Sequence, residues 1–149
     1  MKETIIKQLE ALNTNSNRLS FLCNAMALLS EKMNNTNWVG IYLLKGNTLY
    51  VGPFQGKVAC EKIELGKGVC GKSMETGEIL NIKNVKECSN YISCDPDTKS
   101  EICIPLISNN KKIGVLDIDS KIVNRFNEYD TKILVKIAAI LTEVLSNQN

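Results

Sequence analysis

Lys112-Lys-Ile-Gly-Val-Leu-Asp-Ile-Asp119 is the segment from which the architecture of this chain can be worked out. Its apolar residues alternate as they do in a β-strand with a buried face. One predicted face carries Ile113, Val115, Asp117 and Asp119, and the other carries Gly114, Leu116 and Ile118. Asp117 and Asp119 thus continue an apolar face, where an ionised carboxylate is costly to bury without a partner. The segment therefore predicts a sheet that holds a half-buried acidic site.

The residues before this segment predict its hairpin partner, a strand over Glu101–Ile107. If the connecting loop has three residues, Ser108–Asn110, Glu101 lies opposite Asp117 on the same face. A loop with an even number of residues would send Glu101 to the other face. Three clustered carboxylates raise the pKa of at least one of them, and such a site suits a cationic ligand, a metal ion or proton donation near neutral pH. The alternative is that Asp117 and Asp119 simply end a strand at its solvent edge.

The rest of the chain predicts four helices and four further strands around this hairpin. The helices are expected over residues 2–12, from the capping residues 13–16 to about 33, from the glycines at 66–68 to about 76, and from 127 to about 147. The other strands are expected over Trp38–Leu44, Thr48–Val51, Lys57–Ile63 and Glu78–Ile82, with a loop over 53–56. The polar segment 83–100 has no clear periodicity, and loops of this length are more often functional than neutral. This order predicts one α+β domain over 1–149, a central antiparallel β-sheet with N- and C-terminal helices packed on it.

The composition excludes several classes of function. The 149 residues suit one domain, and 44% hydrophobic residues suffice for a core. With 18 basic against 16 acidic residues and no basic run, neither nucleic acid nor a membrane is an expected partner. Residues 1–10 lack the apolar stretch of a signal peptide, and no run reaches the ~18 apolar residues of a membrane helix. We therefore expect a cytoplasmic location, where thiols are kept reduced.

Six cysteines and the absence of histidine narrow the chemistry further. Without histidine there is no Ser–His–Asp triad, no Cys–His pair and no His-containing metal site. In a reducing compartment such cysteines are metal ligands, redox groups or core residues. None is spaced as CxxC, so neither a zinc ribbon nor a thioredoxin-like motif is predicted. The six are Cys23, Cys60, Cys70, Cys88, Cys94 and Cys103.

The surroundings of these cysteines differ. Cys23, on the apolar face of the second helix, and Cys103, within an apolar strand, are expected to be unreactive core residues. Cys88 is assigned no role. Cys70 follows a glycine-rich turn into a short helix, where amide dipoles favour a thiolate.

Cys94 lies in the long polar loop, where it can be accessible. Its neighbours Asp95 and Asp97 argue against reactivity, because nearby negative charge raises the pKa of a thiol. A nucleophilic Cys94 therefore requires either a fold that offsets these acids or a substrate that is activated by proton donation. The carboxylates of the last strand are the predicted proton donors.

Several separate stretches together match the pattern of one known family. They are Asn37-Trp-Val-Gly-Ile-Tyr42, Gly52-Pro-Phe-Gln-Gly-Lys57, Gly66-Lys-Gly-Val-Cys-Gly71, Ser100-Glu101 and Gly114-Val-Leu-Asp-Ile-Asp-Ser120. Over about residues 37–130 the chain resembles the free methionine-(R)-sulfoxide reductases, which are stand-alone GAF-domain enzymes. Cys60, Cys70 and Cys94 fall on the three cysteines of that family at the expected separations. The resemblance implies a GAF-like fold whose core spans about residues 37–147, after N-terminal helices over about 2–33.

The resemblance also implies a mechanism. Cys94 is the implied nucleophile: its thiolate attacks the sulfoxide sulfur, methionine leaves, and a sulfenic acid remains. A second thiol condenses with that sulfenic acid to a disulfide. Cys60 is favoured as this resolving cysteine, and Cys70 forms an alternative disulfide. Thioredoxin is the implied reductant, no cofactor and no metal are expected, and a homodimer is implied by the family alone.

The same resemblance assigns the substrate contacts. Asp119 is placed near the sulfoxide oxygen and Glu101 near the substrate ammonium, with Asp117 as the third carboxylate of the cluster. Trp38 and Tyr42, four residues apart on one strand face, form a wall for the methyl group, unless they merely pack in the core. Sulfoxides inside a polypeptide lack the ammonium and would leave buried acids unpaired, so the free amino acid is the expected substrate.

Two other functions remain open from the sequence. A non-catalytic GAF module that senses a small ligand or the redox state would explain the fold and the acidic pocket, but it does not require three cysteines at these positions. A metal-dependent hydrolase built on Asp117, Asp119 and Glu101 is the other, although carboxylates alone suit weakly held hard cations.

Overall fold

The structure, a computed structural model, describes residues 2–89, 91 and 94–147. Its helices are α1 (Lys2–Leu12), α2 (Arg18–Lys32), α3 (Gly68–Thr76) and α4 (Glu128–Ser146), with a short 3-10 turn, η1 (Val85–Glu87). Its strands are β1 (Trp38–Lys45), β2 (Thr48–Gly56), β3 (Lys62–Glu64), β4 (Leu80–Ile82), β5 (Ser100–Ser108) and β6 (Lys111–Ser120). All six strands form one antiparallel sheet in the order β3-β2-β1-β6-β5-β4. The predicted α+β class and element order are confirmed.

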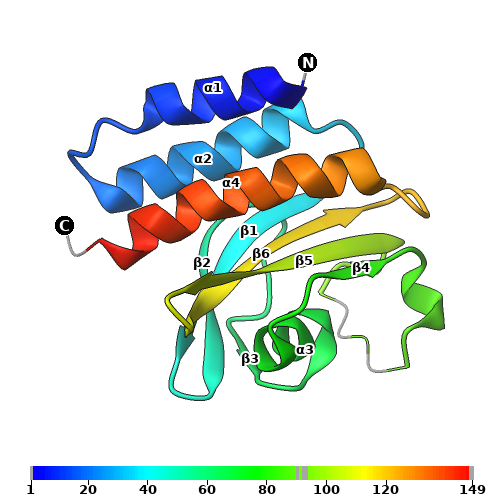
Figure 1. Ribbon diagram of the computed structural model, residues 1–149. Coiled ribbons are helices and arrows are strands. Elements are labelled where there is room, and N and C mark those ends of the chain that lie inside the picture. The colour runs from blue at the N-terminus through cyan, green and yellow to red at the C-terminus, as the bar shows by residue number, and fades with distance from the viewer. Residues whose placement is uncertain (1, 90, 92–93, 148–149) are drawn as a thin grey trace.

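The helices lie on two sides of the sheet. Figure 1 shows α1, α2 and α4 together on one face and α3 on the other. The helix bounds agree closely with those predicted, and α4 begins after Asn127 in a capping box with Asp130. Within the described residues, no helix combines the length and apolar character that crossing a bilayer requires.

Each face of the sheet has its own apolar core, because side chains alternate along the strands. The helical core lies between the sheet and α1, α2 and α4, and takes Ile102 and Leu116 from the two central strands. The second core lies around α3 and includes Cys103 and Val115 from the same strands. The acidic residues of β6 thus lie on the face that only the short α3 and neighbouring loops cover.

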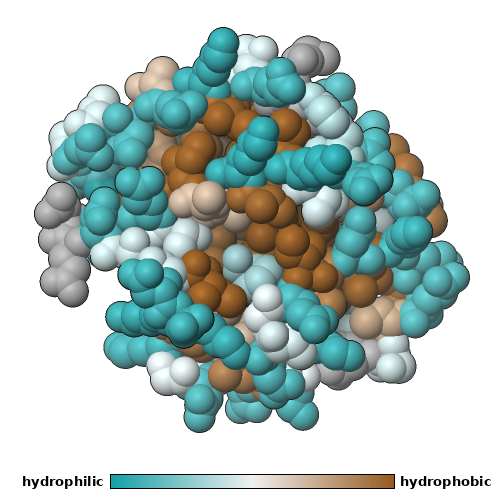
Figure 2. Space-filling view, in the orientation of Figure 1, coloured by the Kyte–Doolittle hydropathy of each residue, from teal (hydrophilic) through white to brown (hydrophobic). Residues whose placement is uncertain are grey.

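An apolar strip remains exposed on the helical side. Figure 2 shows hydrophobic side chains gathered on this face, beside α4 and the strands beneath it. Ile79, Ile107 and Val135 contribute to it, each about 40% exposed (40%, 37% and 42%). They line a groove between α4 and the edge of the sheet.

The predicted apolar face of α2 is partly wrong. Cys23 is exposed rather than part of the core, and Leu19 is 63% exposed. The stripe that contacts the core is completed instead by Phe21 and Ala25, at helical spacing from Leu29. Cys23 therefore lies beside the stripe, not within it.

Two strand predictions near β2 are also corrected. β2 continues through the predicted loop 53–56 to Gly56, whereas Lys57–Glu61 is a loop rather than a strand. Pro53 is tolerated because the β1–β2 register shifts between Gly40 and Tyr42, so no ladder hydrogen bond is needed there. The loop at 57–61 is free to cross the open face of the sheet.

The β5–β6 hairpin differs from its predicted form. The turn has two residues, Asn109 and Asn110, both at positive φ (51° and 64°), as a tight hairpin turn requires. An even turn should place Glu101 on the wrong face, yet it shares a face with the acids because the register shifts between Leu106 and Ile107.

This bulge changes the predicted pairing. Leu106 pairs with Gly114 and Ile107 with Lys112, which leaves Ile113 as the extra residue. Ile113 therefore packs against the helical core instead of sharing a face with Val115. Further along the ladder, the predicted partner of Glu101, Asp117, is wrong by two residues, as the next section describes.

Candidate active site

Three neighbouring strands bring the predicted site residues into register on the face of the sheet that α3 covers. β1 pairs with β6, and β6 pairs with β5, so residues from all three form short rows across the sheet. The first row consists of Trp38, Asp119 and Glu101, and the second of Gly40, Asp117 and Cys103. Glu101 therefore lies opposite Asp119, not opposite Asp117. The three carboxylates remain adjacent on one face, so the predicted cluster exists.

An aromatic wall closes one side of this face. The ring of Trp38 is stacked on Tyr42, with centroids 5.7 Å apart, and on Phe54, at 5.2 Å. Gly40 lies between the two β1 aromatics, and a Cβ at this position would lie 2.6 Å from Cβ of Phe54 and would collide with the indole of Trp38. The absence of a side chain at Gly40 is therefore what allows the indole to lie flat along β1.

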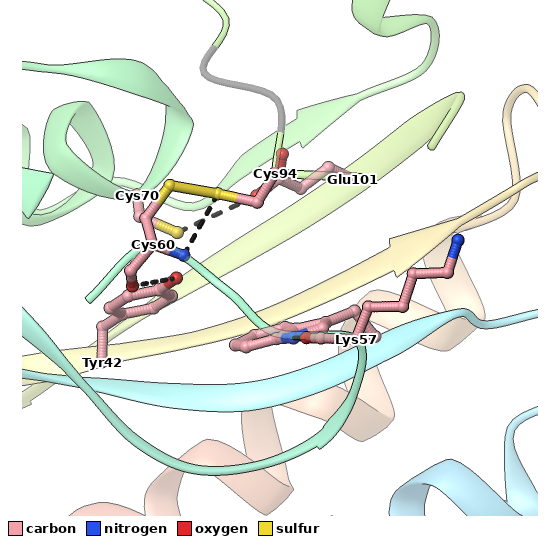
Figure 3. The surroundings of a disulfide bond; sticks show 7 residues. Tyr42, Lys57, Cys60, Cys70, Cys94 and Glu101 are labelled. Carbon is pink, nitrogen blue, oxygen red and sulfur yellow. Dashed lines mark hydrogen bonds between the residues drawn. A yellow bond between two sulfur atoms is a disulfide. The ribbon is translucent and has the colours of Figure 1, made fainter. Parts of the chain in front are cut away.

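The two β1 aromatics also hold the loop after β2. The indole Nε1 of Trp38 donates a hydrogen bond to the carbonyl oxygen of Lys57 at 3.1 Å, and the hydroxyl of Tyr42 donates one to the carbonyl of Cys60 at 3.3 Å. Figure 3 shows this loop crossing above both rings. Trp38 and Tyr42 thus line the cavity and position the loop that carries Cys60, which goes beyond core packing.

Cys60 and Cys94 form a disulfide in the structure, with their Cα atoms 6.2 Å apart. The backbone N–H of Cys60 also donates a hydrogen bond to Sγ of Cys94 at 3.2 Å (Figure 3). This bond ties the loop after β2 to the long polar loop. Of the two thiols considered as partners of Cys94, Cys60 is the one paired here.

Cys70 lies beside this disulfide but is engaged elsewhere. Its Sγ is 3.2 Å from Sγ of Cys103 and donates a hydrogen bond to Oε2 of Glu101 at 3.8 Å. The hydrogen bond with Cys103 lowers the pKa of Cys70, but burial and the charge of Asp117 together raise it to about 12. The prediction that the helix entry favours a Cys70 thiolate is therefore wrong, because the buried acidic surroundings outweigh the amide dipoles.

The carboxylates share a buried environment. Burial raises the pKa of Glu101 well above its usual range, and the charges of Asp117 and Asp119 add to the rise. Burial and Asp117 likewise raise the pKa of Asp119. Burial also raises the pKa of Asp117, although hydrogen bonds from Glu101 and Cys103 lower it. The predicted rise is confirmed, and the cluster can hold protons in neutral solution.

The acids that flank Cys94 are offset by the fold. Lys57 Nζ lies 3.8 Å from Asp95 and 3.9 Å from Asp97. The backbone N–H of Asp97 and the side-chain amide of Asn37 donate hydrogen bonds to Asp95, and with Lys57 they lower its pKa. Negative charge beside Cys94 is thus matched by a cation and by amide donors, as a nucleophilic role requires.

A cavity of about 40 Å³ joins the thiol loop to the acids. Its walls include Cys94, Asp117 and Asp119, together with Trp38, Tyr42 and Glu101. One buried oxygen in this wall, Oδ1 of Asp119, has no hydrogen-bond partner among the described residues. The arrangement can therefore donate a proton to, or accept a hydrogen bond from, a group that is held against Cys94.

Sequence reasoning missed two participants. Tyr91 lines the cavity, and its hydroxyl pKa is raised by burial and by Glu101. As an aromatic residue in a long polar loop, it gave a signal that went unused. Cys103 was expected to be inert, yet its thiol donates hydrogen bonds to Asp117 Oδ1 (3.2 Å) and Glu101 Oε2 (3.5 Å). Its position two residues after Glu101 on one strand was the available signal. Cys88 is half-buried beside the second core, which gives it no evident part in the site.

Comparison with known proteins agrees with this geometry. The GAF domain family model matches residues 17–145. The free methionine-R-sulfoxide reductase of Escherichia coli (strain K12) is 44% identical over 128 residues, which cover 86% of this chain and 78% of that protein. The reduced form of fRMsr of Staphylococcus aureus superposes with a TM-score of 0.91 at 38% identity, covering 97% of this chain and 95% of that one. The free methionine-R-sulfoxide reductase from Neisseria meningitidis, in complex with its substrate, gives 0.92 at 33% identity over 97% and 87%.

Proposed function

Because this chain belongs to the GAF-domain family, and within it to the free methionine-R-sulfoxide reductases, we propose that it reduces free L-methionine (R)-S-oxide to L-methionine. The observation that carries the proposal is the cavity that unites Cys94 with Asp117 and Asp119. A thiol and protonated carboxyl groups are the two components that this reduction needs, and no histidine is required.

The first step is attack on sulfur. The Cys94 thiolate attacks the sulfoxide sulfur, the S–O bond of the substrate breaks, methionine leaves, and the oxygen remains on Cys94 as a sulfenic acid. The cation of Lys57 beside Asp95 and Asp97 supports this role, because it offsets the charges that would disfavour a Cys94 thiolate.

The sulfoxide oxygen must gain a proton as its bond to sulfur breaks. We assign this donation to Asp119, whose buried Oδ1 lacks a partner among the described residues and whose pKa is raised by burial. Glu101 and Asp117 lie beside it and receive the substrate ammonium. A cationic group would relieve the repulsion within the cluster, since none of the ion pairs among the described residues involves these three acids.

The second step regenerates a disulfide. The thiol of Cys60 condenses with the Cys94 sulfenic acid, which forms the disulfide and releases water, so one sulfoxide consumes two thiols. The pairing of Cys60 with Cys94 supports Cys60 as the resolving residue, and the hydrogen bonds of Cys70 to Glu101 and Cys103 argue against Cys70. Thioredoxin then returns both thiols by exchange.

Reduction of this disulfide also admits the substrate. The cavity of the disulfide form holds about 40 Å³, whereas ligand pockets usually measure ~300 Å³ or more. Breaking the Cys60–Cys94 bond releases the loop after β2 and lets the cavity widen between that loop and the acids. Free substrate is selected because only it offers an ammonium to the buried carboxylates.

The proposal has two further parts, a cytoplasmic location and a homodimer. The cytoplasm supplies the dithiol reductant that the cycle needs. The exposed strip at Ile79, Ile107 and Val135 offers an apolar surface that a second copy could cover. Sedimentation of the wild type and of Val135→Glu tests the homodimer, which predicts that the substitution yields monomers.

The activity is tested by a thioredoxin-coupled assay that follows NADPH oxidation. Free L-methionine (R)-S-oxide should be turned over, whereas the (S) epimer and a peptide-bound sulfoxide should not. Cys94→Ser should lose all turnover, and Cys23→Ser should keep it because Cys23 is exposed and remote from the cavity. Binding of the substrate without turnover would favour a sensor module, and chelator-sensitive activity that survives Cys94→Ser would favour a metal-dependent hydrolase.

A further inference from the structure

Four buried side chains converge at the floor of the cavity. They are Cys70 from α3, Glu101 and Cys103 from β5, and Asp117 from β6. One ligand atom of each lies within 4.8 Å of all the others, and each residue is 5% exposed or less. Cys103 is additional to the three cysteines of the proposed reaction, which gives it no part in the cycle described above.

The distances within this cluster match those of a metal centre. The two Sγ atoms are 3.2 Å apart, Cys70 Sγ lies 3.8 Å from Glu101 Oε2, and Cys103 Sγ lies 3.5 Å from the same oxygen. Cys103 Sγ lies 3.2 Å from Asp117 Oδ1. Sulfur and oxygen ligands of tetrahedral Zn²⁺, at bond lengths of about 2.3 and 2.1 Å, are about 3.4–3.8 Å apart. The four atoms thus need to move by only a few tenths of an ångström.

The donor set also has suitable chemistry. Two thiols distinguish it from a purely acidic cluster, because thiolate sulfur selects Zn²⁺ and other thiophilic ions over Mg²⁺ and Ca²⁺. The two carboxylates complete four-coordination without histidine. No Lys or Arg forms an ion pair with Glu101 or Asp117 within the part of the chain described, so a dication would supply charge that the cluster lacks.

We propose that Cys70, Cys103, Glu101 and Asp117 form a Zn²⁺ site, and that Zn²⁺ bound there inhibits the enzyme. Binding replaces the two thiol protons, which pass to solvent, by Zn–S bonds and involves no change of oxidation state. The inhibition, unlike the binding, rests on the proposed function, because the metal would occupy the carboxylates that receive the substrate ammonium. Zn²⁺ and free methionine sulfoxide should therefore compete.

Cys103 is the residue that decides between a metal site and a simple acidic pocket. It contacts each of the other three ligands, whereas it is not among the residues that line the cavity. Replacement of Cys103 by valine removes one of the two sulfur ligands but keeps the packing nearly unchanged. Cys103→Ser, which keeps a hydrogen-bond donor, is the second variant should the valine variant fold poorly.

Binding is measured on the disulfide form, in which Cys60 and Cys94 cannot act as ligands. Co²⁺ is added as a spectroscopic probe, followed by Zn²⁺. The wild type and Cys23→Ser should show sulfur-to-cobalt charge-transfer bands and the visible bands of tetrahedral Co²⁺, which one equivalent of Zn²⁺ abolishes. Cys103→Val and Cys103→Ser should lose these bands. Equal bands in folded Cys103 variants, or no thiolate bands in the wild type, would overturn the site.

Inhibition is measured in a single turnover of reduced enzyme freed of added thiols. Zn²⁺ should slow methionine formation in the wild type, higher sulfoxide concentrations should relieve the inhibition, and Cys103→Val should be at least tenfold less sensitive while still turning over. Equal sensitivity of both proteins would overturn the inhibitory role. If neither protein forms methionine, the proposed function fails, while the Co²⁺ spectra still decide whether the metal site exists.

Discussion

Glu101 lies directly opposite Asp119 across the β5–β6 ladder, on the face of the sheet where the cavity lies. Asp117 is two residues away on the same face, so three carboxyl groups share one buried space. Burial raises the pKa of both Glu101 and Asp119. This relationship gives the site a supply of protons in neutral solution, and the first two predictions follow from it.

Asp119→Asn should remove the proton donor and leave the nucleophile in place. We expect kcat to fall by ~10²–10⁴-fold, the usual contribution of a positioned general acid. The rate at which iodoacetamide alkylates Cys94 in the reduced protein should change little. Glu64→Gln, on the edge strand β3, is the matched control and should keep the wild-type kcat. Wild-type kcat in Asp119→Asn would show that the proton comes from another group.

The same carboxyls should make stability depend on pH. Because the folded-state pKa of Glu101 is raised, its stabilising contribution is complete below the ordinary pKa of ~4.3 and is lost as the pH rises through the folded-state value. The free energy of unfolding should therefore decline between about pH 5 and about pH 8. Glu101→Gln should flatten this decline and gain about 1–3 kcal/mol at the upper end.

Urea denaturation at each pH measures this effect, with Glu64→Gln as the control that should follow the wild type. A Glu101→Gln protein that is less stable than the wild type near the upper pH, with an unchanged slope, would show that Glu101 is ionised and satisfied in the folded state.

Cys60→Ser should separate the two chemical steps. The variant should still form one equivalent of methionine, because Cys94 remains, but its sulfenic acid should persist long enough for dimedone to label it. Cys70→Ser should resolve like the wild type, since the Cys70 thiol contacts Cys103 and Glu101 rather than the disulfide loop. Mass spectrometry of the labelled peptides distinguishes them. Dimedone labelling in Cys70→Ser but not in Cys60→Ser would reverse the assignment.

Gly40→Ala should disturb the aromatic wall. The new Cβ would collide with Trp38 and lie 2.6 Å from Cβ of Phe54, and both contacts are with rigid side chains. Overpacking of this kind costs about 1–3 kcal/mol, and the shifted indole should also raise KM. Gly46→Asn is the control, because Gly46 has open space around it and asparagine tolerates its positive φ of 65°. Unchanged stability and KM in Gly40→Ala would refute this role.

The sequence predicts most of the fold because its periodicities are local. The two N-terminal helices, the final helix after Asn127 and the β5–β6 hairpin follow from spacing and capping alone. The exact partner of Glu101 does not, because a bulge at Ile113 combines with the two-residue turn to set the register. A bulge depends on packing against both faces of the sheet, which no alternation pattern encodes.

The candidate site was predictable to a similar degree. The carboxylates were visible as acids on an apolar strand face, and the aromatic pair was visible from its spacing. The environment of Cys70 was not, because a glycine-rich helix entry favours a thiolate only when its surroundings are polar or cationic, and here they are buried and acidic. The contact of Cys103 with Cys70 joins two distant elements, and only the folded chain brings them together.

The most direct test of the account is a single turnover of the reduced protein with one equivalent of free L-methionine (R)-S-oxide. Methionine and the disulfide map are quantified in the same sample. The account predicts that one equivalent of methionine appears together with one Cys60–Cys94 disulfide, and that Cys94→Ser forms neither. Methionine formation without that disulfide, or persisting in Cys94→Ser, would contradict it.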